Sequence, residues 1–441
     1  MGARRAAHRP EARLKLKPNF IFILADDLGY ADLGCYGGRA SCSPNLDRLA
    51  ADGLRFTDGY SNSPVCSPTR FALATGRWQY RLRGAADEPI ASRIGRGHPE
   101  LGLPPSHPTL ASLLRDAGYA TALIGKWHLG FAPHFGPLKS GYQEFFGPMS
   151  GGVDYFRHCD SAGRHDLYRG EEEVQRTGYM TDLLSDEAVG FVQRQKGKPF
   201  LLSLHYTAPH WPWETRDDVE ESARISSIAH LDGGSVQTYL TMIRQMDEGI
   251  GRVLAAIDDI GARENTFVVF TSDNGGERFS DSWPLVGGKM DLLEGGIRVP
   301  YIARWPGRVP KGGTTARLAI TMDWTATFLN AAGVEPHPDY PMDGIDLLEQ
   351  ERPRNLYWRM KFREQKAMRS GSWKYLSLEG NEFLYDLARD PRERANMRQR
   401  EPARFQRMRD AFSKWEAELP PIPPDAKVSL VYGPADMAKP S

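Results

Sequence analysis

Residues 19 to 27 read Asn-Phe-Ile-Phe-Ile-Leu-Ala-Asp-Asp, an uninterrupted apolar run that ends abruptly in two carboxylates. Apolar residues at every position are typical of a strand that is buried on both faces, as in a parallel sheet covered by helices. A second run, Thr266 to Thr271, ends in the same way in Ser-Asp-Asn-Gly-Gly at 272–276. Such short apolar runs alternate with longer amphipathic stretches along the chain, which predicts an α/β fold with a mostly parallel sheet.

Both runs deliver oxygen-bearing side chains at a strand end, and ligands of open α/β sheets bind at that edge. Two adjacent aspartates, Asp26 and Asp27, repel one another and are costly to desolvate unless a cation compensates. Together with Asp273 and Asn274 they offer only oxygen ligands, which suits Ca²⁺ or Mg²⁺ better than zinc. Either pair alone is equally typical of turn residues, so the prediction of a metal site depends on a third segment.

The third segment is Cys66-Ser-Pro-Thr-Arg70, which Thr75-Gly-Arg77 follows. A proline two residues after the cysteine fits the first turn of a helix, because its missing N–H costs nothing there. We therefore expect Cys66 at a helix N-terminus, where the helix dipole favours an anionic reacting group. The alternative is a buried thiol in a Ser/Pro-rich turn, since free cysteines are among the most buried residues.

The composition excludes several classes of protein. A chain of 441 residues with 40% hydrophobic content can bury a large core, and 56 basic residues balance 56 acidic ones. With no net charge, nothing argues for nucleic acid or a membrane as a partner, and no apolar run reaches the length of a membrane span. The basic, polar segment 1–17 predicts a cytoplasmic protein as written; a periplasmic or secreted location stays open if the start is mis-assigned.

The pattern Cys-x-Pro-x-Arg followed by Thr-Gly-Arg resembles the signature of type I sulfatases, whose cysteine is oxidised after translation to formylglycine (3-oxoalanine). The resemblance implies a formylglycine-generating maturation enzyme as a partner and a role for Arg70 in stabilising the alkoxide of the aldehyde hydrate. The segments that begin at Asp26 and Ser272 are similar to the metal-binding segments of the family. The resemblance thus implies one Ca²⁺ (or Mg²⁺) ion held by Asp26, Asp27, Cys66 as formylglycine, Asp273 and Asn274.

Three further segments agree with this family. Gly-Lys126-Trp-His128-Leu-Gly is similar to a sulfatase block in which the lysine contacts the sulfate and the histidine bonds to the nucleophilic centre. Residues two apart in an extended segment point to the same side, so Lys126 and His128 are expected to face one pocket. His210 matches the second family histidine, and Lys289 matches the second sulfate-binding lysine. By contrast, we expect His205 to be a core histidine.

The resemblance implies an alkaline-phosphatase-like α/β/α sandwich, in which a large mostly parallel sheet is followed by a smaller C-terminal antiparallel sheet and a helix. We predict a basic tail at 1–17, a catalytic domain at 18–342 and a C-terminal subdomain at 343–441. In the last, 367–378 and 382–387 predict a hairpin joined through Glu379-Gly-Asn. Asp390-Pro391 is expected to open an Arg/Glu-rich helix, with the charges of 389–400 on its solvated face.

The function implied is that of a sulfuric ester hydrolase, arylsulfatase-like, acting on a small sulfate ester. In the family mechanism one hydroxyl of the hydrated aldehyde attacks sulfur while Lys126, Lys289 and the metal balance charge. His210 or Lys289 donates a proton to the alcohol, and His128 assists the collapse that expels sulfate. A sulfated-carbohydrate sulfatase and a phosphate or phosphonate ester hydrolase of the same superfamily are the alternatives. Phosphatases of this fold generally need two or three metal ions, and the sequence offers ligands for one.

Some features leave alternatives open. Trp211, Trp213 and the loop 152–156 suggest aromatic walls for an aryl or sugar group, but they could equally pack the loop itself. Four cysteines are too few for a disulfide scaffold, and pairing of Cys35 with Cys42 stays open. The oligomeric state, the native substrate and the choice between Ca²⁺ and Mg²⁺ do not follow from the sequence.

Overall fold

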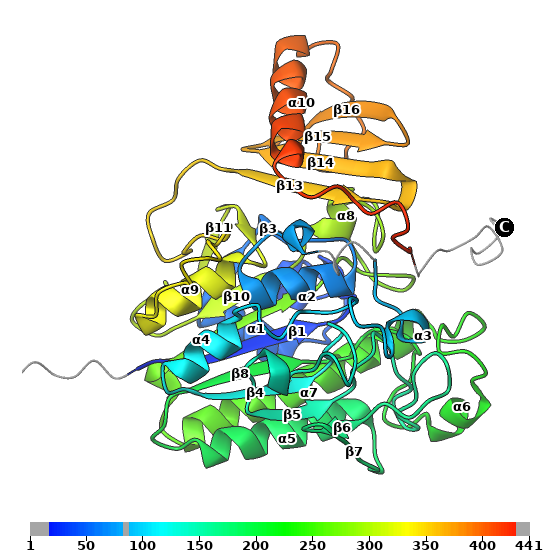
Figure 1. Cartoon of the computed structure of the whole chain (residues 1–441), viewed down its shortest axis with the longest axis vertical. Coiled ribbons are helices and arrows are strands. Elements are labelled where there is room, and N and C mark those ends of the chain that lie inside the picture. The colour runs from blue at the N-terminus through cyan, green and yellow to red at the C-terminus, as the bar shows by residue number, and fades with distance from the viewer. Residues whose placement is uncertain (1–16, 83–87, 429–441) are drawn as a thin grey trace, which may run out of the picture.

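The computed structural model describes residues 17–82 and 88–428. Within them, ten strands form one large sheet in the order β11-β2-β10-β9-β1-β8-β4-β5-β6-β7 (Figure 1). The central block from β9 to β5 is parallel, whereas β10, β6 and β7 run antiparallel to their neighbours. The bounds are β1 Asn19–Ala25, β2 Leu54–Phe56, β4 Ala120–Gly125, β5 Glu144–Gly147, β6 Tyr168–Arg169, β7 Glu172–Glu173, β8 Phe200–His205, β9 Thr266–Ser272, β10 Tyr301–Arg304 and β11 Gly313–Thr315.

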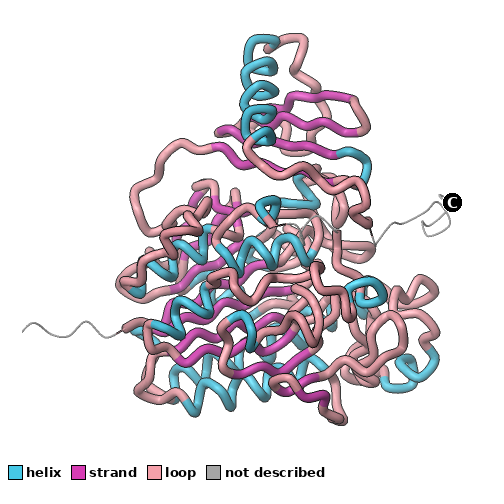
Figure 2. The backbone as a smooth tube through the Cα atoms, viewed as in Figure 1, coloured by secondary structure: helices cyan, strands magenta, loops and turns pink. Residues whose placement is uncertain are grey.

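Two helical layers cover this sheet. Alternate residues of β1 pack into different layers: Ile21 and Ile23 contribute to one core, and Phe20 and Phe22 to the other. The first layer contains α1 Pro44–Ala51, α5 Met180–Arg194 and α7 Val236–Asp259; the second contains α2 Cys66–Thr75, α4 Leu110–Asp116 and α9 Asp323–Ala332. The predicted α/β/α sandwich is confirmed. Figure 2 shows many loops gathered beyond one end of the sheet, at the right of the view.

Smaller elements complete the sandwich. A two-stranded parallel pair joins β3 to β12, and three short helices lie in the loops. Their bounds are β3 Gly59–Tyr60, β12 Ala319–Ile320, α3 Ser92–Gly95, α6 Val219–Arg224 and α8 Glu294–Ile297. No helix among the described residues is long and apolar enough to cross a membrane.

A four-stranded antiparallel sheet and one helix form the C-terminal region, as expected (Figure 1). The strands are β13 Asn355–Met360, β14 Gln365–Ser370, β15 Trp373–Leu378 and β16 Asn381–Asp386, and the helix is α10 Pro402–Ala417. Phe412 and Trp415 of α10 pack into one apolar cluster with Trp358 and Tyr375 of the sheet. The predicted hairpin corresponds to β15 and β16, whereas 367–378 covers most of β14 and all of β15 rather than one strand. The hairpin turn is Glu379-Gly380, with φ of 50° and 79°, so the expected Gly-Asn turn is shifted by one residue.

The helix expected from Asp390 onward was placed wrongly, because α10 begins at Pro402. Residues 389–400 form turns, in which the Asp390 carboxylate accepts the backbone N–H groups of Arg394 and Ala395 at 2.7 Å each. Glu393 is buried with a positive φ of 53° and lies 2.8 Å from the Lys374 ammonium. Local capping bonds and this buried ion pair therefore override the helix propensity of the charged run.

The remaining expectations on the chain as a whole are only partly covered by the structure. Residues 1–16 of the predicted basic tail lie outside the described residues, and the proposed domain boundary near 342 stays a prediction. Cys35, Cys42, Cys66 and Cys159 are all free thiols, so Cys35 and Cys42 do not pair here.

Candidate active site

The two acidic strand ends predicted from sequence lie side by side. Strands β1 and β9 pair in parallel with Ala25 opposite Ser272, so the residues that follow both strands meet at one edge. The side chains of Asp26, Asp27, Asp273 and Asn274 are all buried. Asn274 donates from Nδ2 to Oδ1 of Asp27 at 2.7 Å, and the backbone N–H of Asp27 points to Oδ1 of Asp273 at 3.3 Å.

Cys66 is the first residue of α2, as the proline spacing predicts. One ligand atom from each of Asp26, Asp27, Cys66 and His210 lies within 4.8 Å of the others. Burial raises the pKa of the Cys66 thiol to about 12, although the ammonium groups of Lys126 and Lys289 oppose the shift. An unmodified Cys66 is therefore a neutral thiol at pH 7, and thiols are poor nucleophiles beside thiolates.

Three cations surround the carboxylates. Arg70, one turn along α2, donates from Nε and Nη2 to Oδ2 of Asp273 at 3.0 and 2.8 Å. Lys126 Nζ lies 2.6 Å from Oδ2 of Asp26, and Lys289 Nζ lies 2.7 Å from Oδ2 of Asp27. Three carboxyl groups face three cations, so the group carries no excess negative charge. A bound divalent cation would make the cluster positive, which favours an anionic substrate.

The side chains fit a hard divalent cation. Oδ1 of Asp26 and Oδ1 of Asn274 are buried acceptors without a hydrogen-bond partner among the described residues. Burial and the neighbouring Asp273 raise the pKa of Asp26 to about 8, so this carboxylate is costly to ionise in its present surroundings. Buried oxygens in this state need compensation by a cation, and carboxylate and amide oxygens are the ligands that Ca²⁺ and Mg²⁺ prefer.

The two predicted histidines both reach the site, and each is oriented by a backbone carbonyl. His128 Nε2 lies 2.8 Å from the Ile90 carbonyl oxygen, and His210 Nδ1 lies 2.6 Å from that of Trp211. In the neutral rings these nitrogens carry the proton, which leaves Nδ1 of His128 as an acceptor without a partner among the described residues. Burial and the nearby lysines hold both pKa values well below the usual range.

Two glycines that the sequence did not single out as site residues make room for these imidazoles. A Cβ atom added to Gly151 would lie 2.3 Å from Cε1 of His128, and one added to Gly152 would lie 2.9 Å from Cε1 of His210. Ser150 fixes the loop that carries these two glycines, because its backbone N–H donates to Oδ2 of Asp166 at 2.8 Å. The Ser-Gly-Gly sequence was the available signal, but the contact with the histidines arises only in the folded chain.

A cavity of about 230 Å³ opens over the cluster and is lined by Cys66, His128, His210, Lys289, Gly151 and Trp211, among others. Of the two alternatives left open by the sequence, Trp211 forms a wall of the cavity, whereas Trp213 is buried against Phe279 and does not line it. Tyr155 is buried as well, and its hydroxyl donates to backbone carbonyls. The aromatic residues after Gly152 therefore pack the loop.

His205 is a core histidine, as the sequence predicted, and Arg298 also lies outside the catalytic cavity. His205 is buried near Arg70, with Nδ1 at 3.5 Å from Nη1, and it does not line the catalytic cavity. Arg298 donates to the Thr57 carbonyl at 2.7 Å and pairs with Asp58 at 3.4 Å. Both side chains therefore bond to neighbouring segments and do not line the catalytic cavity.

Comparison with known proteins assigns the family. The profile of the family described as Sulfatase matches residues 18–334. The chain belongs to the sulfatase family. This match includes all ten residues that the sequence assigned to catalysis or metal binding.

Named relatives resemble the chain over most of its length. It is 37% identical to the N-acetylgalactosamine-6-sulfatase of Canis lupus familiaris over 75% of this chain, but spans only 65% of that relative's length. It is 34% identical to arylsulfatase A of Homo sapiens, with 75% of this chain and 67% of the relative covered. The crystal structure of Ps i-CgsB in complex with k-i-k-neocarrahexaose has 31% identity and a TM-score of 0.81, covering 92% of this chain and 94% of that one. The fold of this sulfatase-family chain is accordingly the alkaline-phosphatase-like sandwich that the sequence predicted.

Proposed function

We propose that this chain hydrolyses sulfate monoesters, with a formylglycine made from Cys66 as the nucleophile and one divalent cation, Ca²⁺ or Mg²⁺. The observation that carries the proposal is the placement of Cys66 at the N-terminus of α2, within 4.8 Å of carboxylate oxygens of Asp26 and Asp27 and a nitrogen of His210. A neutral thiol beside these carboxylates is not made more reactive by them. An oxygen at the same position can instead be a ligand of a cation that the carboxylates also bind.

Asp26, Asp27, Asp273 and Asn274 would hold the cation. When bound, it supplies positive charge beside the oxygen carried at position 66, which lowers the pKa of that oxygen. Arg70 orients Asp273 through two hydrogen bonds, so its contact in this structure is with a carboxylate. Its proposed contact with the alkoxide at position 66 stays a prediction.

Lys126 and Lys289 are the cations placed to receive the sulfate oxygens, because they extend toward Asp26 and Asp27 from two different segments. His128 presents an unpartnered Nδ1, which suits it to accept a proton from the oxygen at position 66. His210 and Lys289 both line the cavity, so either can deliver a proton to the departing alcohol. Lys289 donates directly as an ammonium, whereas a neutral His210 must first take up a proton.

The substrate we propose is a sulfated sugar, with aryl sulfates as model substrates. Trp211 supplies an apolar wall on which a pyranose or aryl ring can lie, in a cavity of about 230 Å³. The names of the relatives support a carbohydrate, since one is an N-acetylgalactosamine-6-sulfatase and another was solved with a neocarrahexaose. A phosphate ester would meet the same cations, so a weak side activity on phosphate esters is expected.

The test has two stages. Protein from a host with a maturation enzyme is digested with trypsin, and the peptide 56–70 is weighed and treated with an aldehyde reagent. An aldehyde at position 66, together with sulfate release from N-acetylgalactosamine 6-sulfate or an aryl sulfate, is the expected result. An unmodified thiol in a host that matures other sulfatases would overturn the formylglycine mechanism.

A further inference from the structure

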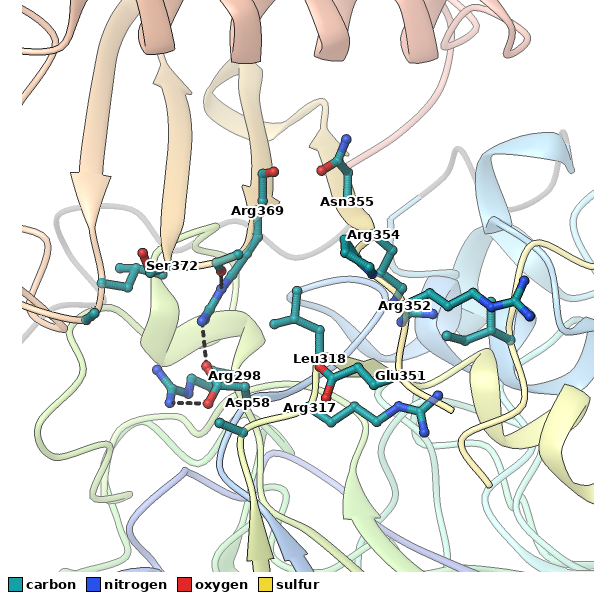
Figure 3. A pocket seen from close by; sticks show the side chains of 17 residues that line it. Asp58, Arg298, Arg317, Leu318, Glu351, Arg352, Arg354, Asn355, Arg369 and Ser372 are labelled. Carbon is teal, nitrogen blue, oxygen red and sulfur yellow. Dashed lines mark hydrogen bonds and ion pairs between the residues drawn. The ribbon is translucent and has the colours of Figure 1, made fainter. Parts of the chain in front are cut away.

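A second and larger cavity lies between the sandwich and the C-terminal sheet, and we call it the seam cavity. Its volume is about 860 Å³, against about 230 Å³ for the catalytic cavity, and the two share no lining residue among the described ones. The sandwich contributes Arg298 and Arg317, and the C-terminal region contributes Arg352, Arg354 and Arg369. Figure 3 shows Arg298 and Arg369 on one side, Arg352 and Arg354 on the other, and Leu318 between them.

The seam cavity is remote from the catalytic centre. Strand β13 connects the two regions: Met360 at its end packs with Val65 and Met290, which are chain neighbours of Cys66 and Lys289. Asn355 at the other end of β13 lines the seam cavity. A strand rises about 3.3 Å per residue, so β13 spans about 16 Å from Asn355, which lines the seam cavity, to Met360, which packs beside the chain neighbours of the catalytic residues. A ligand in the seam cavity is therefore not the group that reacts at Cys66.

The arginines differ in how far acidic groups compensate them. Arg298 and Arg369 pair with Asp58, at 3.4 and 2.5 Å, and Arg354 pairs with Asp323. Arg317 instead donates to three backbone carbonyl groups, those of Asp346, Leu347 and Glu349. These bonds fix its guanidinium but leave its positive charge without a carboxylate partner among the described residues.

Arg352 is the second uncompensated cation. It is exposed, and the described residues provide it with neither a hydrogen bond nor an ion pair. Asp58 and Glu351 are the acidic side chains of the lining, and Asp323 and Glu294 outside it pair with lining arginines, so five arginines face four carboxylates. Since the whole chain has no net charge at pH 7, this surplus is a local feature. Guanidinium groups bind sulfate, carboxylate and phosphate oxygens through paired N–H donors.

The other lining groups narrow the ligand class. No aromatic side chain lines the cavity within the described part of the chain, so a ligand there is held by charge and hydrogen bonds rather than by stacking. Leu318, Ile345 and Leu387 offer small apolar surfaces, while Asn355, Ser370 and Ser372 offer neutral hydrogen-bonding groups. Anionic groups spaced along hydroxyl-rich rings would satisfy this mixture.

We propose that the seam cavity binds an anionic oligosaccharide, whose sulfate or carboxylate groups contact Arg317 and Arg352, as a second carbohydrate site apart from the catalytic cavity. The carbohydrate class rests on the proposed function; the anionic character rests on the arginines alone. Such a site holds a polymer on the protein independently of the ester that is being cleaved.

The experiment measures binding of a chondroitin sulfate octasaccharide to the full chain by calorimetry, with unsulfated chondroitin octasaccharide as the second probe. Arg352→Glu reverses a charge in the cavity wall, and Arg352→Lys keeps it. Arg407→Glu is the matched control, because Arg407 is also exposed and without a partner among the described residues, but lies on α10. Turnover of 4-methylumbelliferyl sulfate and the melting temperature are measured in parallel.

We expect Arg352→Glu to weaken octasaccharide binding by about tenfold, the size of one lost charge-assisted contact, while Arg352→Lys, which keeps the charge but not the paired donors, weakens it less, and Arg407→Glu changes it less than about twofold. Turnover of the small ester stays unchanged in all three. Binding of the unsulfated probe would assign the contact to carboxylates, and its loss would assign it to sulfates. Equal effects of Arg352→Glu and Arg407→Glu, or no effect of either, overturn the proposal. Arg352-sensitive binding without any sulfate release would leave this site standing and remove the proposed function.

Discussion

Two clusters of charged side chains in this molecule have the same charge balance but are built differently. The catalytic cluster combines three carboxylates with three cations: Asp26, Asp27, Asp273, Arg70, Lys126 and Lys289. The seam cluster, which joins the sandwich to the C-terminal sheet, also combines three with three: Asp58, Glu294, Glu393, Arg298, Arg369 and Lys374. The balance of positive and negative charges alone therefore does not distinguish a reactive site from a structural one.

The difference lies in what is left over after pairing. In the seam cluster Lys374 bridges Glu294 and Glu393 at 3.0 and 2.8 Å, and both carboxylates are buried. In the catalytic cluster Oδ1 of Asp26 and Oδ1 of Asn274 have neither a hydrogen bond nor an ion pair among the described residues, whereas Oε1 of Glu393, which also lacks a hydrogen bond, lies 2.8 Å from the Lys374 ammonium. Positive φ occurs in both clusters, at Asp27 (63°) and His128 (58°) in the catalytic site and at Glu393 (53°) in the seam cluster, so the backbone conformation does not distinguish them. Buried acceptors without any partner thus indicate a site that can take up a further group such as a cation. Buried charges that are paired directly with one another instead indicate a structural role in joining the sandwich to the C-terminal sheet.

The largest effect should follow from removing the residue on which the catalytic cluster converges. Cys66→Ala is expected to lower sulfate release below detection, by at least about 10⁴-fold, because no other side chain supplies the nucleophile. Cys42→Ala is the matched control, since Cys42 is also a buried free thiol but lies in the core. Both variants should melt within a few degrees of the unmodified sequence. Turnover by Cys66→Ala above about 1% would contradict the assignment.

The second largest effect should follow from removal of the metal, which should affect the catalytic cluster and leave the seam cluster unchanged. Dialysis against a chelator is expected to lower turnover by about 10³-fold, and restored Ca²⁺ or Mg²⁺ at 100 times its Kd should stabilise the fold by about 2.7 kcal/mol. Asn274→Ala removes a neutral proposed ligand without leaving a buried charge unpaired, and should abolish the metal-dependent rise in melting temperature. Lys374→Met should retain that rise, because it alters only the seam cluster. Full turnover after complete chelation, verified by elemental analysis, would exclude a catalytic metal.

Breaking the seam cluster should affect stability and not chemistry. Lys374→Met leaves Glu294 and Glu393 buried without their shared ammonium group, and is expected to lower the free energy of unfolding by about 3–5 kcal/mol. Urea denaturation measures the loss, and kcat of the folded fraction should change less than about twofold. Lys366→Met is the control, since its pair with Glu416 is partly exposed and should contribute less than about 1 kcal/mol. Equal losses in both variants would show that burial of the seam cluster is unimportant.

The sequence was informative wherever a local pattern determines both structure and chemistry. The runs that become β1 and β9 predicted buried parallel strands, and their polar ends predicted one shared edge, because the carboxyl ends of parallel strands meet. Pro68 predicted that Cys66 begins a helix. These inferences needed only spacing and residue type, and the family resemblance extended them to Lys126, His210 and Lys289.

What the sequence did not reveal depends on contacts between distant segments. Gly151 meets the His128 ring and Glu393 meets Lys374 only after folding, and no local pattern encodes either contact. The misplaced start of α10 has the same origin, because helix propensity favoured a helix from Asp390 while a buried ion pair required a turn at Glu393. Trp213 was indistinguishable from Trp211 in sequence, yet only Trp211 lines the cavity.

A smaller effect is expected where packing positions a group of the catalytic site. Gly151→Ala places a methyl group 2.3 Å from Cε1 of His128, so the ring or the loop must move. We expect kcat to fall by about 10–100-fold with little change in melting temperature, since misplacement of a catalytic group is costly for the reaction. Gly136→Ala is the control, because the nearest atom to its added Cβ is Cε of Met149 at 3.8 Å. An unchanged kcat in Gly151→Ala would mean that His128 needs no such fit.

The smallest effect we predict is a pH dependence of stability that originates in the seam cluster. Burial and the neighbouring Glu294 raise the pKa of Glu393 from 4.5 to about 7, although Lys374 opposes the shift. The folded state holds this proton more tightly than the unfolded state. Its contribution to the free energy of unfolding is therefore fully present below pH 4.5 and is lost as the pH rises through about 7.

Glu393→Gln should remove this dependence, because an amide stays neutral at every pH in the range. The expected difference between the variant and the unmodified sequence changes by about 1–2 kcal/mol between pH 4.5 and pH 6, in favour of the variant at the higher pH. Urea denaturation at several pH values measures it, with Glu401→Gln as the control, since Glu401 is partly exposed and pairs only with Arg404. If the two variants follow the same pH profile, Glu393 ionises as freely as a surface carboxylate, and the seam cluster is more hydrated than its burial indicates. A difference confined to Glu393→Gln would instead show that the seam cluster stabilises the fold most strongly under mildly acidic conditions.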